Sequence, residues 1–253
     1  MGRKYGVSVI SLVPHSLGSM GLQKSLDIAI CELGLDGIQA LPMRGWSCNQ
    51  KSYEELLPKN LKELVISFES SWNYGTAFQA LKRRFGFGEE GYPTFLDLYL
   101  FDKESESILR VMENIFGWDK YISHTLRNSG YRYMAEIGPD NVQIQNYVDY
   151  KHGLVWDTWH VREKYMPDWK NLLSALLPER IKLIHFHPKD GRELAEFVAG
   201  KKNELAEMLK YLAVKVPKDC PVIIETRPMI FRSRKSLVIK LRLIRDALFD
   251  ILG

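Results

Sequence analysis

Short apolar runs that alternate with longer amphipathic stretches are the feature of this sequence that most restricts its fold. Eight runs rich in Val, Ile, Leu and aromatic residues recur along the chain, and we expect each to form a strand: residues 6–12, 36–41, 63–68, 94–100, 131–136, 153–157, 181–187 and 221–225. Strands that are apolar on both faces are typical of a parallel sheet covered by helices. The alternation therefore predicts an α/β fold.

The longer stretches have the spacing of amphipathic helices. We expect helices over residues 19–33, 104–126, 194–212 and 236–252. In the first, Leu26, Ile30 and Leu33 recur at intervals of four and three, which places them on one helix face. Asp190 precedes the third stretch as a candidate N-cap. These helices are expected to cover the sheet.

Eight strand–helix units in 253 residues match what a (β/α)₈ TIM barrel requires. We therefore predict that residues 1–253 form a single TIM-barrel domain, with its site at the C-terminal mouth of the strands. A doubly wound open sheet is the alternative. No GxGxxG motif follows the first run to mark the dinucleotide site of such a sheet, so the barrel is preferred.

Composition excludes several classes of protein. With 45% hydrophobic and 11% aromatic residues the chain is not intrinsically disordered, and no apolar run approaches the roughly 20 residues that cross a bilayer. Thirty-five Lys and Arg against 31 Asp and Glu leave a formal charge of +4, a mild excess that does not indicate a dedicated nucleic-acid binder. No small-residue cleavage site follows the first apolar run, so we expect a cytoplasmic protein without a signal peptide.

Residues that bind divalent metals or move protons stand at or just beyond the ends of the last four predicted strands. They are Glu136, Asp157 with His160, His185 with His187, and Glu225. In a parallel barrel all strands end at the same mouth, where active sites are built, so we expect these side chains to converge. Carboxylate and imidazole ligands without sulfur suit Mn²⁺, Mg²⁺, Co²⁺ or Zn²⁺. The pattern predicts a divalent metal site.

The two histidines of the seventh strand have to be separated. Strand alternation places His185 and His187 on one face, with Phe186 opposite. His187 is nearer the mouth and is the better candidate ligand. His185 is either part of the site or a hydrogen-bonded core histidine below it, and the sequence leaves both interpretations open.

Four motifs in the second half of the chain resemble those of a known family. They are Ala135-Glu136, Asp157-Thr-Trp-His160, His185-Phe-His187-Pro-Lys-Asp190 and Ile223-Ile-Glu225. Together with the order of elements over the whole chain, they are similar to the xylose-isomerase-like TIM barrels, a superfamily of sugar isomerases, sugar epimerases, inosose dehydratases and an apurinic endonuclease. The resemblance implies one metal ion held by Glu136, Asp157, His187 and Glu225, and a substrate contact from His160. It also implies that the two glutamates exchange a proton with the carbon beside the sugar carbonyl.

The sequence departs from this family in two places. Gln39 stands in the second strand where many relatives have a glutamate, so it cannot act as a base but could bind a sugar hydroxyl. The third and fourth predicted strands contain none of the histidines that a three-zinc endonuclease site would take from them. We therefore expect one metal ion.

Cations after the last two strands suggest the charge of the substrate. They are Lys189, Arg192, Arg227, Arg232, Arg234 and Lys235. Phosphate sites in such barrels use these loops, so Arg192 and Arg227 are candidate contacts to a phosphorylated or carboxylated substrate. The alternative is that residues 232–235 simply begin a solvated basic helix. His15, just beyond the first strand, and His185 are further candidates for substrate binding.

Three functions follow from these observations. The first is a metal-dependent isomerase or epimerase that acts on a small polyhydroxylated substrate, a sugar or sugar phosphate, through an enediolate, with Glu136 and Glu225 as the acid–base pair. The second is an apurinic-site endonuclease-like phosphodiesterase. The third is a non-catalytic barrel that retains a ligand or metal site. We expect no membrane partner; nucleic acid as a partner and assembly into a homo-oligomer are left open.

Overall fold

A computed structural model describes residues 2–16, 21–40, 64–71, 122–126, 134–137, 144–150, 153–165, 168–227 and 233–253. The strands in these ranges are β1 (Tyr5–Ser8), β2 (Gly37–Ala40), β3 (Val65–Ser71), β4 (Ile122–Leu126), β5 (Met134–Ile137), β6 (Leu154–Asp157), β7 (Ile181–Phe186) and β8 (Val222–Ile224). Each strand pairs with the next along the chain, and β8 pairs with β1. The predicted strand at 94–100 lies outside the described residues.

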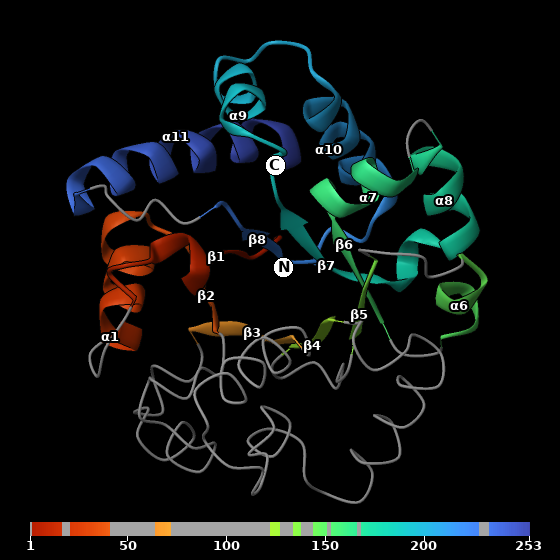
Figure 1. Cartoon of the computed structure of the whole chain (residues 1–253), viewed down its shortest axis with the longest axis horizontal. Helices are drawn as coiled ribbons and strands as arrows, with labels where there is room; N and C mark the ends of the chain where they lie inside the picture. Colours follow the sequence, from red (N-terminus) through yellow and green to blue (C-terminus); the bar gives the residue numbers. More distant parts are fainter. Residues whose placement is uncertain are drawn as a thin grey trace, which may run out of the picture.

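Helices lie outside the strands. They are the short helices η1 (Val9–Leu12), η2 (Asp27–Glu32) and η4 (Pro178–Arg180), and the α-helices α1 (Gly21–Leu26), α6 (Ile144–Asp149), α7 (Thr158–Tyr165), α8 (Trp169–Leu176), α9 (Gly191–Val198), α10 (Glu204–Lys215) and α11 (Arg234–Leu252). In Figure 1 they form an arc that runs from α1 past α11, α9 and α10 to α8 and α6. Among the helices of the described ranges, none has the length and apolar character needed to span a membrane.

The prediction of a (β/α)₈ TIM barrel is wrong. Such a barrel is parallel throughout, whereas β4 runs antiparallel to both neighbours: its Leu126 lies opposite Ser67 of β3, and its Ser123 lies opposite Ala135 of β5. The other six pairings are parallel. The fold is thus α/β with a mixed sheet. A strand can join its neighbour in the antiparallel direction without the helical crossover that parallel pairing requires.

The reversed strand occupies a segment that the sequence assigned to a helix. Residues 122–126 were the end of the helix expected over 104–126, but they contain Ile122 and Thr125, whose β-branched side chains favour extended backbone. Pairing on both edges with β3 and β5 then stabilises the strand. This competition between local helical spacing and sheet pairing could not be resolved from the sequence.

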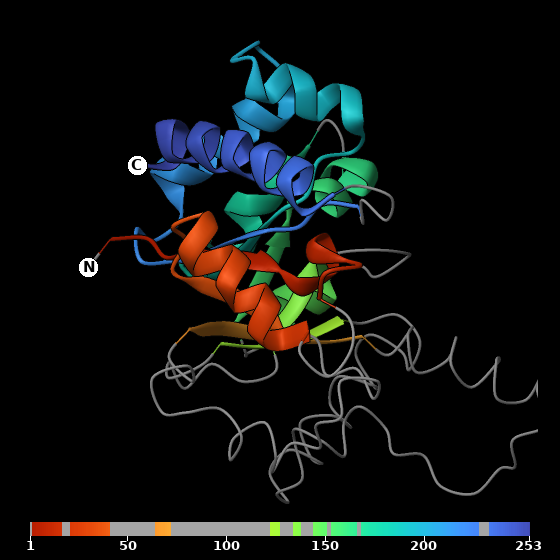
Figure 2. The same ribbon diagram turned by 90° about the vertical axis from the view of Figure 1, so that its left-hand side faces the viewer.

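The other helices agree with the sequence more closely. The stretch 236–252 forms α11, which begins at Arg234. The single helix expected over 194–212 is divided into α9 and α10, because Gly200 has a φ of +67° and Asn203 caps a new helix by accepting a hydrogen bond from the Ala206 amide. Figure 2 shows α11 beside the η2 segment, where Arg242 Nε donates to the Glu32 carbonyl at 2.8 Å.

An apolar layer inside the ring of strands lies beneath the candidate site. It is a separate cluster of the buried residues Ile66, Met134, Val155, Leu183 and Ile223. Outward-facing side chains belong to a larger core with the helices, as where Trp156 Nε1 contacts Met208 Sδ of α10 at 3.3 Å. Side chains two positions apart share one face of a strand. Two positions after Met134, Val155, Leu183 and Ile223 stand Glu136, Asp157, His185 and Glu225. Strand alternation therefore points these four polar side chains to the inside of the ring, at its mouth.

We expect Gly37→Ala to destabilise the protein by at least about 2 kcal/mol, since a Cβ at this position would collide with the carbonyl oxygen of Leu64. Gly191→Ala is the matched control, because a Cβ there meets nothing within 4 Å. Urea unfolding of both variants measures the difference. Equal stability of the two would contradict the close approach of β2 to residue 64.

Candidate metal centre

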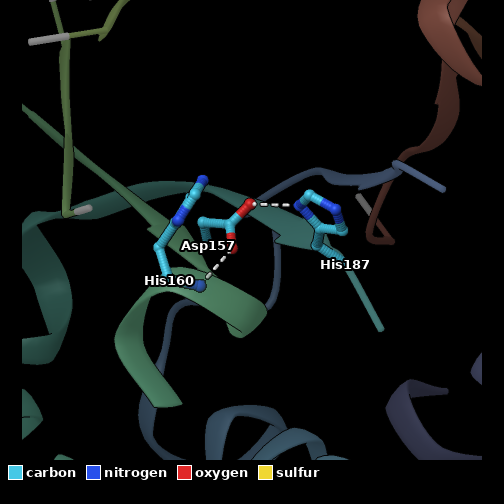
Figure 3. Close-up of side chains that lie close together, drawn as sticks. All are labelled: Asp157, His160 and His187. Atoms are coloured by element: carbon cyan, nitrogen blue, oxygen red, sulfur yellow. Dashed lines mark hydrogen bonds and ion pairs between the residues drawn. The ribbon is translucent and has the colours of Figure 1, made fainter. Parts of the chain in front are cut away.

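Asp157 is the hub of the site. It ends β6 and also begins α7, because its Oδ1 accepts hydrogen bonds from the amides of Trp159 at 2.8 Å and His160 at 2.7 Å. Its Oδ2 lies 3.1 Å from Nδ1 of His187. Figure 3 shows this carboxylate between the two histidine side chains. One residue therefore links the end of β6, the start of α7 and the segment after β7.

His185 points one ring nitrogen at three carboxylates. Its Nδ1 lies 3.2 Å from Glu225 Oε2, 3.4 Å from Glu136 Oε2 and 3.8 Å from Asp157 Oδ2. Its Nε2 lies 2.9 Å from Gln39 Oε1, which also accepts a hydrogen bond from Ser67 Oγ at 2.8 Å. Because an amide oxygen only accepts, Nε2 carries a hydrogen. Nδ1 then presents the carboxylates with either a proton or a lone pair.

Burial makes this concentration of negative charge costly unless a cation lies within it. Asp157 and Glu136 are buried, and the Glu225 side chain is 14% exposed. Isolated ionised carboxylates are strongly disfavoured in a protein interior. A protonated His185 supplies one positive charge, and a metal ion bound through the lone pair of Nδ1 would supply two.

Two overlapping groups in the described ranges could hold a metal ion. Glu136, Asp157 and His185 form one, and Asp157, His160 and His187 form the other; within each, one ligand atom per residue lies within 4.8 Å of the others. His160 Nε2 also lies 3.6 Å from Glu136 Oε1, which joins the groups on a second side. Oxygen and imidazole nitrogen donors, buried and aimed at a common point, are the chemistry that metal binding requires.

The charges change the protonation behaviour of the residues concerned. Burial alone would lower the pKa of His185, but the facing carboxylates of Asp157, Glu225 and Glu136 raise it to about 10. The pKa of His187 is raised against burial in the same way, first of all by Asp157. Burial would raise the pKa of Asp157, yet His187 and His185 hold it well below its usual range. The metal-free site is thus a set of ion pairs.

The main chain of His187 is held by a polar network between α7 and α9. Thr158 Oγ1 accepts from the His187 amide at 2.8 Å and donates to its carbonyl at 3.1 Å. Arg162, buried on α7, donates to the same carbonyl at 3.3 Å and forms a two-pronged ion pair with Glu193. Glu193 Oε2 also accepts from the Lys189 amide at 2.6 Å. This network fixes the segment that carries His187.

The structure brings most of the sequence candidates together, and His185 takes the central position among the carboxylates. Of the four expected metal ligands, Glu136, Asp157 and Glu225 surround His185, whereas His187 contacts Asp157. Both interpretations of His185 hold in part, since one nitrogen is hydrogen-bonded below the site and the other faces into it. Gln39 is buried under the cluster and binds His185.

The remaining candidates divide. Arg227 lies near the cluster, with its guanidinium 5.3 Å from the centre of the Trp159 ring. Arg192 is exposed and pairs with Glu196 on its own helix. Within the described ranges no hydrogen bond or ion pair joins His15 to the cluster, and its Nε2 is buried without a hydrogen-bond partner; Arg232 falls outside these ranges.

Sequence reasoning missed Ser67, Thr158, Arg162 and Glu193. Arg162 and Glu193 are separated by 31 residues, and each reads as an ordinary charged position on an amphipathic helix. Asp190 was the nearest signal: it was expected to cap the helix, and its Oδ1 accepts from the amides of Arg192 and Glu193 at 2.9 Å. That cap places Glu193 in the first turn of α9, but only the tertiary structure brings Arg162 to it.

No protein-family model matches the chain, and comparison with curated proteins and with solved structures found no match either.

We expect the metal-free protein to lose stability as the pH rises. His185 has a folded pKa of about 10 against an ordinary 6.5, so its contribution is complete below about pH 6.5 and declines until the pH passes about 10. Urea unfolding in the presence of EDTA measures this dependence. His185→Gln should abolish most of the slope. A metal-free protein whose stability is constant from pH 7 to 10 would contradict the ion-pair arrangement.

Glu193→Gln should weaken metal binding although Glu193 is not among the candidate ligands. Removing this charge leaves the buried guanidinium of Arg162 without its ion-pair partner, which we expect to cost about 3 kcal/mol of stability. Because the His187 segment loses its anchor, and His187 contacts the candidate ligand Asp157 at 3.1 Å, the affinity for Mn²⁺ should fall about tenfold. Calorimetry measures both quantities, with Glu196→Gln, in an exposed pair on the same helix, as the control. Equal Mn²⁺ affinity in the two variants would refute the anchoring role.

Proposed function

We propose that this protein is a divalent-metal-dependent enzyme that removes a proton from a carbon beside the carbonyl of a small polyhydroxylated substrate and returns it to the neighbouring carbon, as a sugar isomerase does, or to the same carbon, as an epimerase does. One observation carries the proposal. Glu136 at the end of β5 and Glu225 just after β8 approach the same nitrogen of His185, at 3.4 and 3.2 Å, from opposite sides of the β6–β7 pair. Two carboxylates so placed can act as a base and an acid on one bound substrate.

The donor set supports a single hard or borderline ion. Glu136, Asp157 and His185 would hold it, with Glu225 next to the same nitrogen. Oxygen and imidazole ligands without sulfur favour Mn²⁺, Mg²⁺, Co²⁺ or Zn²⁺. When bound, such an ion polarises a carbonyl and an adjacent hydroxyl and so stabilises the negative charge left when a C–H proton departs.

The residues around the ion divide the remaining work. Glu136 is almost completely buried, with 3% of its side chain exposed, whereas 14% of Glu225 is exposed. Each carboxylate has two oxygens, so one can face the ion while the other removes or returns a proton at carbon. Return of the proton by the same glutamate to the neighbouring carbon gives an isomerase, and return by the other glutamate to the opposite face of the same carbon gives an epimerase. Gln39 accepts a hydrogen bond from Nε2 of His185 and so holds that imidazole in place beneath the two glutamates.

Glu225→Gln should reduce this proton transfer at least about 10²-fold at equal metal content, because an amide cannot accept the proton. We would incubate Mn²⁺-loaded protein with D-xylulose, D-fructose and D-ribulose 5-phosphate in D₂O and follow C–H exchange by NMR. Metal content is measured for every variant. Glu207→Gln, in an exposed pair with Lys170, is the control and should behave as wild type.

The outcomes separate the interpretations. Exchange that is unchanged in Glu225→Gln would remove this glutamate from the chemistry. Bound metal without exchange on a wider panel of sugars and sugar phosphates would favour the non-catalytic interpretation.

A phosphodiesterase acting at abasic sites is the second candidate, and one observation favours it. The groups of Glu136, Asp157, His185 and of Asp157, His160, His187 share a carboxylate, as the two ions of many hydrolytic sites do. Two ions per chain in the same metal measurement, with cleavage of an abasic duplex, would place this activity first.

A further inference from the structure

We propose that Arg227 and Trp159 form a binding site for a carboxylate or phosphate group of the substrate, beside the metal-binding residues. The inference rests on the proposed function and adds the substrate class: a polyhydroxylated acid or phosphate ester in preference to a neutral sugar. It follows from three observations: the packing of Trp159, the partners of Arg227 and the charge of the cluster.

Trp159 is in direct contact with the cluster. Its indole stacks on the imidazole of His160, with ring centres 5.0 Å apart at 23°, and meets the ring of His187 edge-on at 4.6 Å. Its amide is bound to Asp157 Oδ1, so the position of the side chain is set by the same carboxylate that organises the site. The indole is therefore a fixed wall beside two of the candidate ligands.

Arg227 lies against this wall and differs from the other described arginines. Arg162, Arg192, Arg234 and Arg245 pair with carboxylates, and Arg3, Arg180 and Arg242 donate to backbone carbonyls. Arg227 is exposed, and within the described ranges its contact is with the Trp159 ring, at 5.3 Å from guanidinium to ring centre. A guanidinium laid on an aromatic ring keeps its N–H groups available and loses little freedom on binding a planar anion.

Charge explains why a cation is needed here. Even beside a divalent ion, three carboxylates gathered around His185 disfavour the close approach of a negatively charged group unless another cation lies nearby. Arg227 offsets that repulsion close to where the substrate would lie. His160, which stacks on the same indole, offers the substrate a second polar contact. Its Nδ1 is buried and has no hydrogen-bond partner among the described residues.

The test is a titration of Mn²⁺-loaded full-length protein with erythritol, D-erythronate and erythritol 4-phosphate. These probes share a four-carbon polyol and differ in the charged group. We expect at least one charged probe to bind ten or more times as tightly as erythritol, and Arg227→Gln to remove that preference. Arg227→Lys should retain only part of it. Arg192→Gln, also at an exposed arginine, is the control and should keep the preference in full. The tighter of the two charged probes identifies the carboxylate or the phosphate as the natural group.

Each result distinguishes this inference from the function on which it rests. Equal affinities for the three probes in wild type, or a preference that survives in Arg227→Gln, would overturn the anion site while leaving metal binding and proton exchange intact. Protein that binds no Mn²⁺ would contradict the proposed function. If the protein binds no Mn²⁺ but still binds a charged probe more tightly than erythritol, and Arg227→Gln removes that difference, the anion site is supported. If it binds the three probes equally, the anion site is overturned as well.

Discussion

Mutual repulsion among three carboxylates is the constraint on which the rest of the site depends. Glu136, Asp157 and Glu225 meet at one nitrogen of His185 in a largely buried space, where their charges are poorly screened. The imidazole is held from below by Gln39 and cannot turn away without losing that hydrogen bond. A proton on His185 or a metal ion must therefore accompany the carboxylates. Because the metal ion replaces the proton, metal binding depends on pH.

The sheet tolerates one reversed strand because the site does not depend on it. The candidate ligands lie at the ends of β5, β6, β7 and β8, whose mutual pairings are all parallel. Parallel strands deliver their C-terminal ends to one side, and the apolar layer of Val155 and Leu183 closes the space beneath them. The antiparallel β4 pairs on the far side of β5 and leaves this arrangement unchanged.

How far the sequence could predict each part follows from the range of the interaction. Asp157, His185 and Glu225 were recognisable because each ends a local apolar run, and alternation within a strand sets the direction of its side chain. The pairing of β4, the ion pair of Arg162 with Glu193 and the packing of Arg227 on Trp159 join distant segments through contacts that no local pattern records. They could not be predicted for that reason.

The sequence by itself determined that this chain forms alternating strands and helices and that acidic and imidazole side chains collect where the last four strands end. Both properties depend on the spacing of apolar and polar residues within short segments, which can be counted directly in the sequence. Only the tertiary structure decided that β4 is antiparallel and that His185, more than His187, faces the carboxylates. The registers of β6, β7 and β8 bring Asp157 opposite His185 and His185 opposite Ile223, and such a register is a property of the assembled sheet.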